Sequence, residues 1–134
     1  MVLLTIYHNP KCSKSRNALA ILQENQTKDG KVNYELDVVR YHTAPPSTET
    51  LQQLVDYLGL ADKDAATRPW DDLLRPEAKK KADSWEEVFQ MIQKDPALLE
   101  RPFVVDWDRR KAALGRPDTS GVEELVATRV QQNA

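Results

Sequence analysis

The segment that decides the fold of this chain reads Tyr7-His8-Asn9-Pro10-Lys11-Cys12-Ser13-Lys14-Ser15-Arg16-Asn17. Before it, residues 2–7 are rich in β-branched and aromatic side chains, which predicts a buried strand. Asn9-Pro10 breaks that strand. From about Ser13 the apolar residues recur at helical spacing, which predicts an amphipathic helix. The segment therefore places Cys12 between the end of a strand and the start of a helix.

Cys12 is the only cysteine in the chain. A lone cysteine is more often a small buried hydrophobic residue than a nucleophile. The neighbours here are polar and cationic, however, and the start of a helix carries a partial positive charge. Both conditions lower the pKa of a thiol and favour the thiolate. We expect Cys12 to be a nucleophile toward an anionic or oxidised substrate.

The composition excludes several classes of protein. The chain has 134 residues, which suits one domain with one core, and a net charge of −2, which gives no basic field for nucleic acid. No apolar run approaches the roughly 20 residues that span a bilayer, and no signal peptide is recognisable. One cysteine cannot form an internal disulfide, and His8 and His42 have no ligand spacing with it. We expect a cytoplasmic protein without bound metal or cofactor, nucleic-acid partner or membrane anchor.

The first third of the chain predicts a βαβ unit. Residues 25–30 are turn formers that end the first helix, and apolar side chains then alternate with polar ones from Val32 to Val38. Strand, helix and strand at this spacing form a right-handed unit with parallel strands.

The rest of the chain predicts a helical insert followed by a hairpin and a last helix. Ser47 caps a helix that Gly59 ends, short helices and loops fill residues 62–83, and Ser84 opens a capping box. The later elements are a strand at 102–105, a turn at 106–110, a weaker strand at 112–115 and a second capping box at Ser120-Gly121-Val122-Glu123. This order fits an α/β fold with a four-stranded mixed sheet flanked by helices. The position of Cys12 favours a thioredoxin-like, glutaredoxin-type version of it. The prediction is a single domain over residues 1–134, with the helical insert, at about 47–99, between strands 2 and 3.

Three kinds of thiolate chemistry can be compared. A dithiol redox site needs a second cysteine where this chain has Ser15. A cysteine phosphatase loop of the form Cys-x5-Arg would need arginine where Ala18 stands, and Arg16 comes too early. What is left is a monothiol site that attacks an oxyanion or a disulfide and needs an external thiol to complete the cycle.

Three motifs together resemble a known family. His8-Asn9-Pro10-x-Cys12-x-x-Ser15-Arg16-Asn17 is similar to the active-site segment of the ArsC-type arsenate reductases, which are coupled to glutathione and glutaredoxin. Glu100-Arg101-Pro102-Phe103-Val104-Val105 resembles the second family motif, and Gly115-Arg116-Pro117 resembles the third. Their order and approximate spacing match across nearly the whole chain.

The resemblance implies an activity and a set of site residues. The activity is reduction of arsenate to arsenite, with glutathione as co-substrate, glutaredoxin as partner and arsenate or a similar oxyanion as substrate. Guanidinium groups suit such an anion because their planar forks bind two oxygens at once. By resemblance Pro102 occupies the place of the cis-proline of thioredoxin-like folds, so we expect a cis Arg101–Pro102 bond. The residues carried over are Cys12 as nucleophile, Arg101, Arg116 and Arg75 as oxyanion ligands with Arg68 as the alternative third arginine, and His8, Ser15 and Arg16 as groups that stabilise the thiolate.

Two other functions stay open at this point. The chain could be an Spx-like redox regulator that binds RNA polymerase, although Ser15 removes the local Cys-x-x-Cys switch that many such proteins use. It could also be a monothiol oxidoreductase that acts on glutathione mixed disulfides without any role for arsenic.

Overall fold

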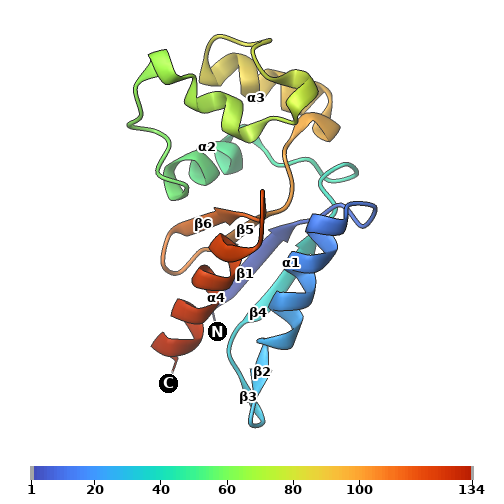
Figure 1. Ribbon diagram of the computed structural model, residues 1–134, viewed down its shortest axis with the longest axis vertical. Coiled ribbons are helices and arrows are strands. Elements are labelled where there is room, and N and C mark those ends of the chain that lie inside the picture. Colours follow the sequence, from blue (N-terminus) through green and yellow to red (C-terminus); the bar gives the residue numbers. More distant parts are fainter. Residues whose placement is uncertain (1, 134) are drawn as a thin grey trace. The chain divides into compact units, whose positions relative to one another are not determined.

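The computed structural model describes residues 2–133, which form two compact units (Figure 1). The first unit contains the described residues up to Arg40 and those from Arg101 onward, and the second unit is Tyr41–Glu100. The second unit coincides closely with the helical insert that the sequence predicts. That the whole chain folds as a single domain stays a prediction.

A four-stranded mixed sheet forms the centre of the first unit. Its order is β4-β1-β5-β6. The central strand β1 (Leu3–Tyr7) runs parallel to β4 (Glu35–Val39) and antiparallel to β5 (Phe103–Asp106), which pairs in turn with β6 (Lys111–Leu114). The predicted α/β class and the mixed, thioredoxin-like sheet are therefore confirmed.

Helices α1 (Ser13–Glu24) and α4 (Ser120–Gln132) lie on the same face of this sheet (Figure 1). The side chains that point to this face from β1 and β5 form one buried cluster with the apolar stripes of both helices. That cluster consists of Leu4, Ile6, Ala18, Leu22, Tyr34, Val104, Val122, Leu125 and Val126. Burial of this apolar surface fixes α1 against the sheet, and so fixes the direction in which its first turn points.

The strand expected from Val32 to Val38 is interrupted in the structure. Its first part belongs to a small hairpin of β2 (Thr27–Lys28) and β3 (Lys31–Val32), and only Glu35–Val39 enters the main sheet. Asp29 and Gly30 form the hairpin turn with φ values of 53° and 77°, a conformation that Asp-Gly pairs adopt readily. The buried Tyr34 separates the two parts, and its hydroxyl donates to the Leu22 carbonyl oxygen at 2.5 Å.

The capping box predicted at Ser120 is wrong. Ser120 is already the first residue of α4, and Thr119 at the N-cap makes no side-chain cap hydrogen bond. The Oδ1 atom of Asp118 instead accepts the Ser120 N–H at 2.9 Å. A carboxylate at this position satisfies a helix-start N–H group and complements the positive end of the helix dipole.

The second unit is helical. It contains α2 (Thr48–Tyr57), α3 (Trp85–Lys94) and four short 3₁₀ turns. Ser47 and Ser84 cap α2 and α3 as predicted, each accepting a backbone N–H three residues later. At α3 the Glu87 carboxylate returns to the N–H of Asp83 rather than to that of the capping serine. Within residues 2–133, no helix has the length and apolarity that crossing a membrane requires.

A buried ion pair joins α4 to the last residue of β5. Arg129 donates from Nε to Oδ2 of Asp106 at 2.9 Å and from Nη2 to Oδ1 at 3.2 Å. Both side chains are almost fully buried, and Asp108 accepts a further bond from Nη2 at 2.8 Å. This two-point contact anchors the C-terminal end of α4.

Candidate active site

Cys12 lies at the N-cap of α1, directly after the loop that follows β1. Its backbone is extended, with φ −98° and ψ 123°. Its N–H donates to the Asn9 carbonyl oxygen at 3.0 Å, and its own carbonyl accepts the Arg16 N–H at 3.0 Å. The half-buried thiol is free, not part of a disulfide. The sequence-predicted position at the start of a helix is therefore confirmed.

Arg116 reaches the sulfur atom of Cys12. Its Nη2 atom donates to Sγ at 3.0 Å, and its Nε atom donates to the Arg101 carbonyl oxygen at 2.6 Å. One guanidinium thus binds both the thiol and the backbone of the second predicted arginine. Residues more than 100 positions apart in sequence meet here because β1 and β5 are neighbours in the sheet.

The backbone at Gly115 brings Arg116 and Arg101 together. The Gly115 N–H donates to the Pro102 carbonyl oxygen at 2.8 Å, so pairing continues past the ends of β5 and β6. A Cβ atom on residue 115 would lie 2.6 Å from Cγ of Pro102. Only glycine allows this approach. The sequence motif contains Gly115, but nothing in the local pattern says that the ring of Pro102 faces it.

Both arginines precede proline, and both peptide bonds are cis. The cis Arg101–Pro102 bond is confirmed, whereas the cis Arg116–Pro117 bond was not expected.

The surroundings of Cys12 lower the pKa of its thiol below the ordinary value. Partial burial acts in the opposite direction and raises it, but the Ser15 N–H group and the guanidinium groups of Arg101 and Arg116 favour the thiolate more strongly. The Ser15 contact is not a regular cap hydrogen bond, since none joins the Cys12 side chain to the helix. The lowered pKa agrees with the prediction from sequence, and two arginines rather than neighbouring lysines are the cations responsible.

His8 is buried and contacts Ser15. Its Nδ1 atom lies 2.7 Å from Oγ of Ser15, which also accepts the Asn9 N–H at 3.0 Å. Burial lowers the pKa of His8, and the charges of Arg40 and Arg16 lower it further. Both effects favour the neutral imidazole, and its contact with Ser15 holds the first turn of α1. Whether His8 and Ser15 influence the chemistry at Cys12 stays a prediction.

Arg16 supports the loop before Cys12. Its exposed guanidinium donates from Nη1 to the Pro10 carbonyl oxygen at 3.0 Å. The contact closes the loop from Pro10 back onto the first turn of α1.

The two candidates for a third arginine belong to the second unit, and both form ion pairs there. Arg75 donates from Nη1 to Oε1 of the buried Glu100 at 2.7 Å. Arg68 contacts Asp71 at 3.1 Å and Asp83 at 3.0 Å, and it stacks over the Trp70 ring. An oxyanion would have to share either guanidinium with a carboxylate. The role of Arg75 therefore stays a prediction, with Arg68 as the alternative.

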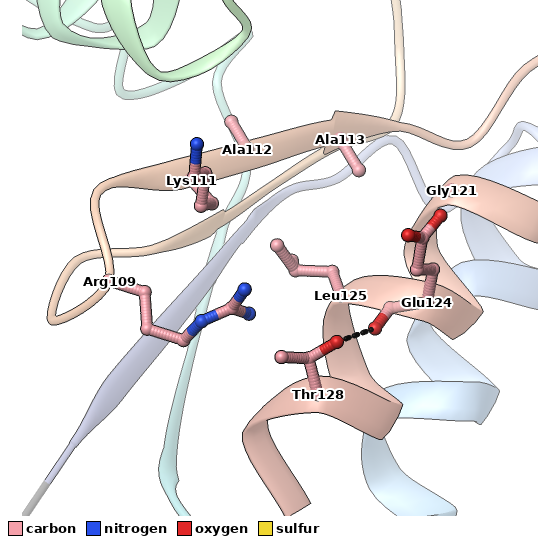
Figure 2. A pocket seen from close by; sticks show the side chains of 8 residues that line it. All are labelled: Arg109, Lys111, Ala112, Ala113, Gly121, Glu124, Leu125 and Thr128. Atoms are coloured by element: carbon pink, nitrogen blue, oxygen red, sulfur yellow. Dashed lines mark hydrogen bonds between the residues drawn. The ribbon is translucent and has the colours of Figure 1, made fainter. Parts of the chain in front are cut away.

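A cavity of about 360 Å³ lies between β6 and α4 (Figure 2). The Arg109 side chain points into it toward Leu125 and Thr128. None of its lining residues is a predicted site residue; they are Arg109, Lys111, Ala112, Ala113, Gly121, Glu124, Leu125 and Thr128. In the described part of the chain, no group of three or more His, Cys, Asp or Glu side chains could hold a metal ion.

Comparisons with known proteins agree with this geometry. Residues 2–115 match the model of a family described as "Protein of unknown function (DUF1687)". An arsenate reductase of Neisseria meningitidis is 36% identical over 115 residues, which are 85% of this chain and 91% of the relative. The uncharacterized protein YfgD of Escherichia coli is 36% identical over 119 residues, which are 88% of this chain and 92% of that protein.

A solved structure gives the same result. The arsenate reductase from Vibrio cholerae superimposes with a TM-score of 0.66 at 30% identity, covering 91% of this chain and 97% of the other. The likeness extends over nearly the full length of both proteins. This chain belongs to the ArsC-type arsenate reductase family.

Proposed function

We propose that this chain is an oxidoreductase that reduces arsenate to arsenite through the thiolate of Cys12. The observation that carries the proposal is the contact of 3.0 Å between Arg116 Nη2 and Cys12 Sγ, with Arg101 beside it. A cation on a thiolate promotes ionisation and also attracts an anionic substrate to the nucleophile.

The site suits a tetrahedral oxyanion. Arsenate is an anion at neutral pH, and planar guanidinium groups bind pairs of its oxygens through charge-assisted hydrogen bonds. The N–H groups in the first turn of α1, which have no acceptor within the helix, provide further donors. Arg101 and Arg116 are the arginines proposed to bind the anion, and Arg75 is the proposed third.

The first step is attack of the Cys12 thiolate on arsenic. A sulfur–arsenic bond forms, and one arsenate oxygen takes up protons and leaves as water. Glutathione thiolate then attacks the sulfur of Cys12, and the electron pair of the sulfur–arsenic bond stays on arsenic. Arsenic passes from the pentavalent to the trivalent state, and Cys12 is left in a mixed disulfide with glutathione.

An external thiol must complete the cycle because Cys12 is the only cysteine in the chain. The thiolate of glutaredoxin attacks the glutathione sulfur of the mixed disulfide and releases the Cys12 thiolate.

The test is arsenate-dependent oxidation of NADPH in an assay coupled through glutathione, glutaredoxin and glutathione reductase. We expect turnover with wild type and none with Cys12→Ser. Turnover of a glutathione mixed disulfide without any response to arsenate would refute the proposal and favour a monothiol oxidoreductase. Co-purification with RNA polymerase and no turnover of either substrate would favour a regulator.

The arginines are tested by matched pairs of variants. Arg116→Ala and Arg101→Ala should weaken arsenate binding more than the lysine variants, because the fork is lost together with the charge. Arg110→Ala removes a charge from the turn at the opposite end of β5 and β6 and serves as the control. Arg75→Ala and Arg68→Ala, made separately, decide the third position.

A further inference from the structure

Lys14 forms a second connection between the helix that carries Cys12 and the loop that carries Arg116. Its Nζ atom donates to the Pro117 carbonyl oxygen at 2.5 Å, across 103 positions of sequence. Pro117 directly follows Arg116. The ammonium group also lies near Asp118: the hydrogen bonds from Ser120 lower the pKa of that carboxyl, and the charge of Lys14 lowers it further.

This connection is placed where the loop has few other anchors. Residues 115–119 link β6 to α4. The loop is attached to the sheet through the Gly115 N–H at one end and to α4 through Asp118 at the other. Between these ends, Arg116 contacts Cys12 and Arg101, and Lys14 holds the next carbonyl. Two contacts at the adjoining residues Arg116 and Pro117 thus fasten the loop to the start of α1.

Lys14 does not act on the sulfur directly. The groups that favour the thiolate of Cys12 are the Ser15 N–H, Arg101 and Arg116. The Lys14 ammonium is instead directed to the Pro117 carbonyl, on the loop that carries one of these groups. We therefore expect the influence of Lys14 on the thiol to act through the position of Arg116.

We propose that Lys14 is a positioning residue that holds the 115–119 loop so that the Arg116 guanidinium stays on Cys12 Sγ. The inference deepens the proposed function, because Arg116 would be kept ready for the anion before it binds. The inference rests on the proposed function only for the reason why Arg116 must be held in place. The positioning itself can be measured without arsenate.

The test is a double-mutant cycle with the thiol pKa of Cys12 as readout. The pKa is measured from thiolate absorbance against pH in wild type, Lys14→Met, Arg116→Met and the double variant. Methionine keeps the length of the lysine side chain and removes both its charge and its donor. We expect Lys14→Met to raise the pKa by roughly half a unit, which is a roughly threefold fall in the ratio of thiolate to thiol at a given pH. In the Arg116→Met background the same change should add nothing, because the residue it positions is gone.

Two further variants separate positioning from charge. Lys11→Met removes an exposed charge next to Cys12 in sequence and leaves the loop contact intact, so it should shift the pKa less than Lys14→Met. Lys14→Arg keeps a cationic donor and should restore the wild-type pKa. Far-ultraviolet circular dichroism confirms that each variant is folded before titration.

Three outcomes would overturn the inference. They are an unchanged pKa in Lys14→Met, a shift that persists in full without Arg116, and a shift that Lys11→Met reproduces. None of them bears on arsenate reduction, which the coupled assay tests separately. Conversely, a protein that does not reduce arsenate could still show the expected pKa shifts in the double-mutant cycle.

Discussion

Replacing Gly115 by alanine tests the contact that brings Arg116 to Cys12. The new Cβ atom would lie 2.6 Å from Cγ and 3.0 Å from Cδ of Pro102. Ordinary carbon–carbon contacts are about 3.5–4.0 Å, so the two strand ends must separate by about 1 Å. The ring of Pro102 is buried and cannot rotate away as a flexible side chain would. The strain must therefore move the backbone.

The expected magnitude combines two effects on stability. Overpacking of a tight contact costs about 1–3 kcal/mol. Replacing glycine by alanine restricts the unfolded chain, which offsets about 0.4–1 kcal/mol of this cost. We expect a net loss of roughly 1–2 kcal/mol in the free energy of unfolding.

The same change should weaken the thiolate. The Gly115 N–H bond to Pro102 and the Arg116 Nε bond to Arg101 both depend on the close approach. A hydrogen bond to a charged group contributes about 1.5–3 kcal/mol, and solvent at the half-buried thiol reduces this. Partial loss of the Arg116 contact should raise the pKa of Cys12 by about half to one unit.

Urea unfolding followed by circular dichroism measures the stability, and iodoacetamide reactivity against pH measures the thiol pKa. Gly121→Ala is the matched control, because its Cβ would meet Ala113 Cβ at 3.6 Å and the Leu114 carbonyl oxygen at 3.7 Å, which are ordinary distances. Because Gly121 lies within α4, its change to alanine should raise the free energy of unfolding by up to about 1 kcal/mol. If Gly115→Ala unfolds like the control and keeps the wild-type thiol pKa, the contact does not position Arg116.

Three other expected outcomes concern pH and stability. The stability of wild type relative to Cys12→Ala should rise with pH between the lowered thiol pKa and the ordinary value of about 8.5, because only the folded thiol is ionised in that interval. Below the lowered pKa the difference should no longer change with pH, and urea midpoints across pH measure this. Arg129→Met should lower the free energy of unfolding by roughly 3 kcal/mol, since it leaves the buried Asp106 carboxylate with only the Arg109 N–H and the more distant Arg109 guanidinium, and a second change of Asp106 to leucine should recover part of the loss. Ser84→Ala should cost about 1 kcal/mol and speed hydrogen exchange in the first turn of α3, whereas unchanged exchange would show that the cap contributes nothing there.

Much of the fold could be predicted from local patterns. Three elements each bury one face: the strand before Cys12, the helix after it and the hairpin near Val105. Burial of one face makes apolar residues recur about every two residues in a strand and every 3.6 residues in a helix. The caps at Ser47 and Ser84 are equally local, since the hydroxyl and the N–H it accepts are three residues apart.

The local predictions failed where a partner from elsewhere in the chain or a second polar side chain decided the outcome. The strand from Val32 to Val38 has continuous alternation, but burial of Tyr34 against α1 and the Asp29-Gly30 turn divide it. Ser120 has the pattern of a cap, yet it already lies inside α4, and the Asp118 carboxylate accepts the Ser120 N–H two residues later.

The sequence by itself determined that Cys12 begins a helix among cations and that no second thiol exists to resolve it, since both are properties of neighbouring residues and of composition. The motifs pointed to Arg101 and Arg116 only through resemblance. The tertiary structure decided which cations touch the sulfur: Arg116 does, while Lys14 is turned to the Pro117 carbonyl. These contacts join residues about 100 positions apart, and their partners become neighbours only when β5 and β6 pair beside β1 and α1 packs on the sheet.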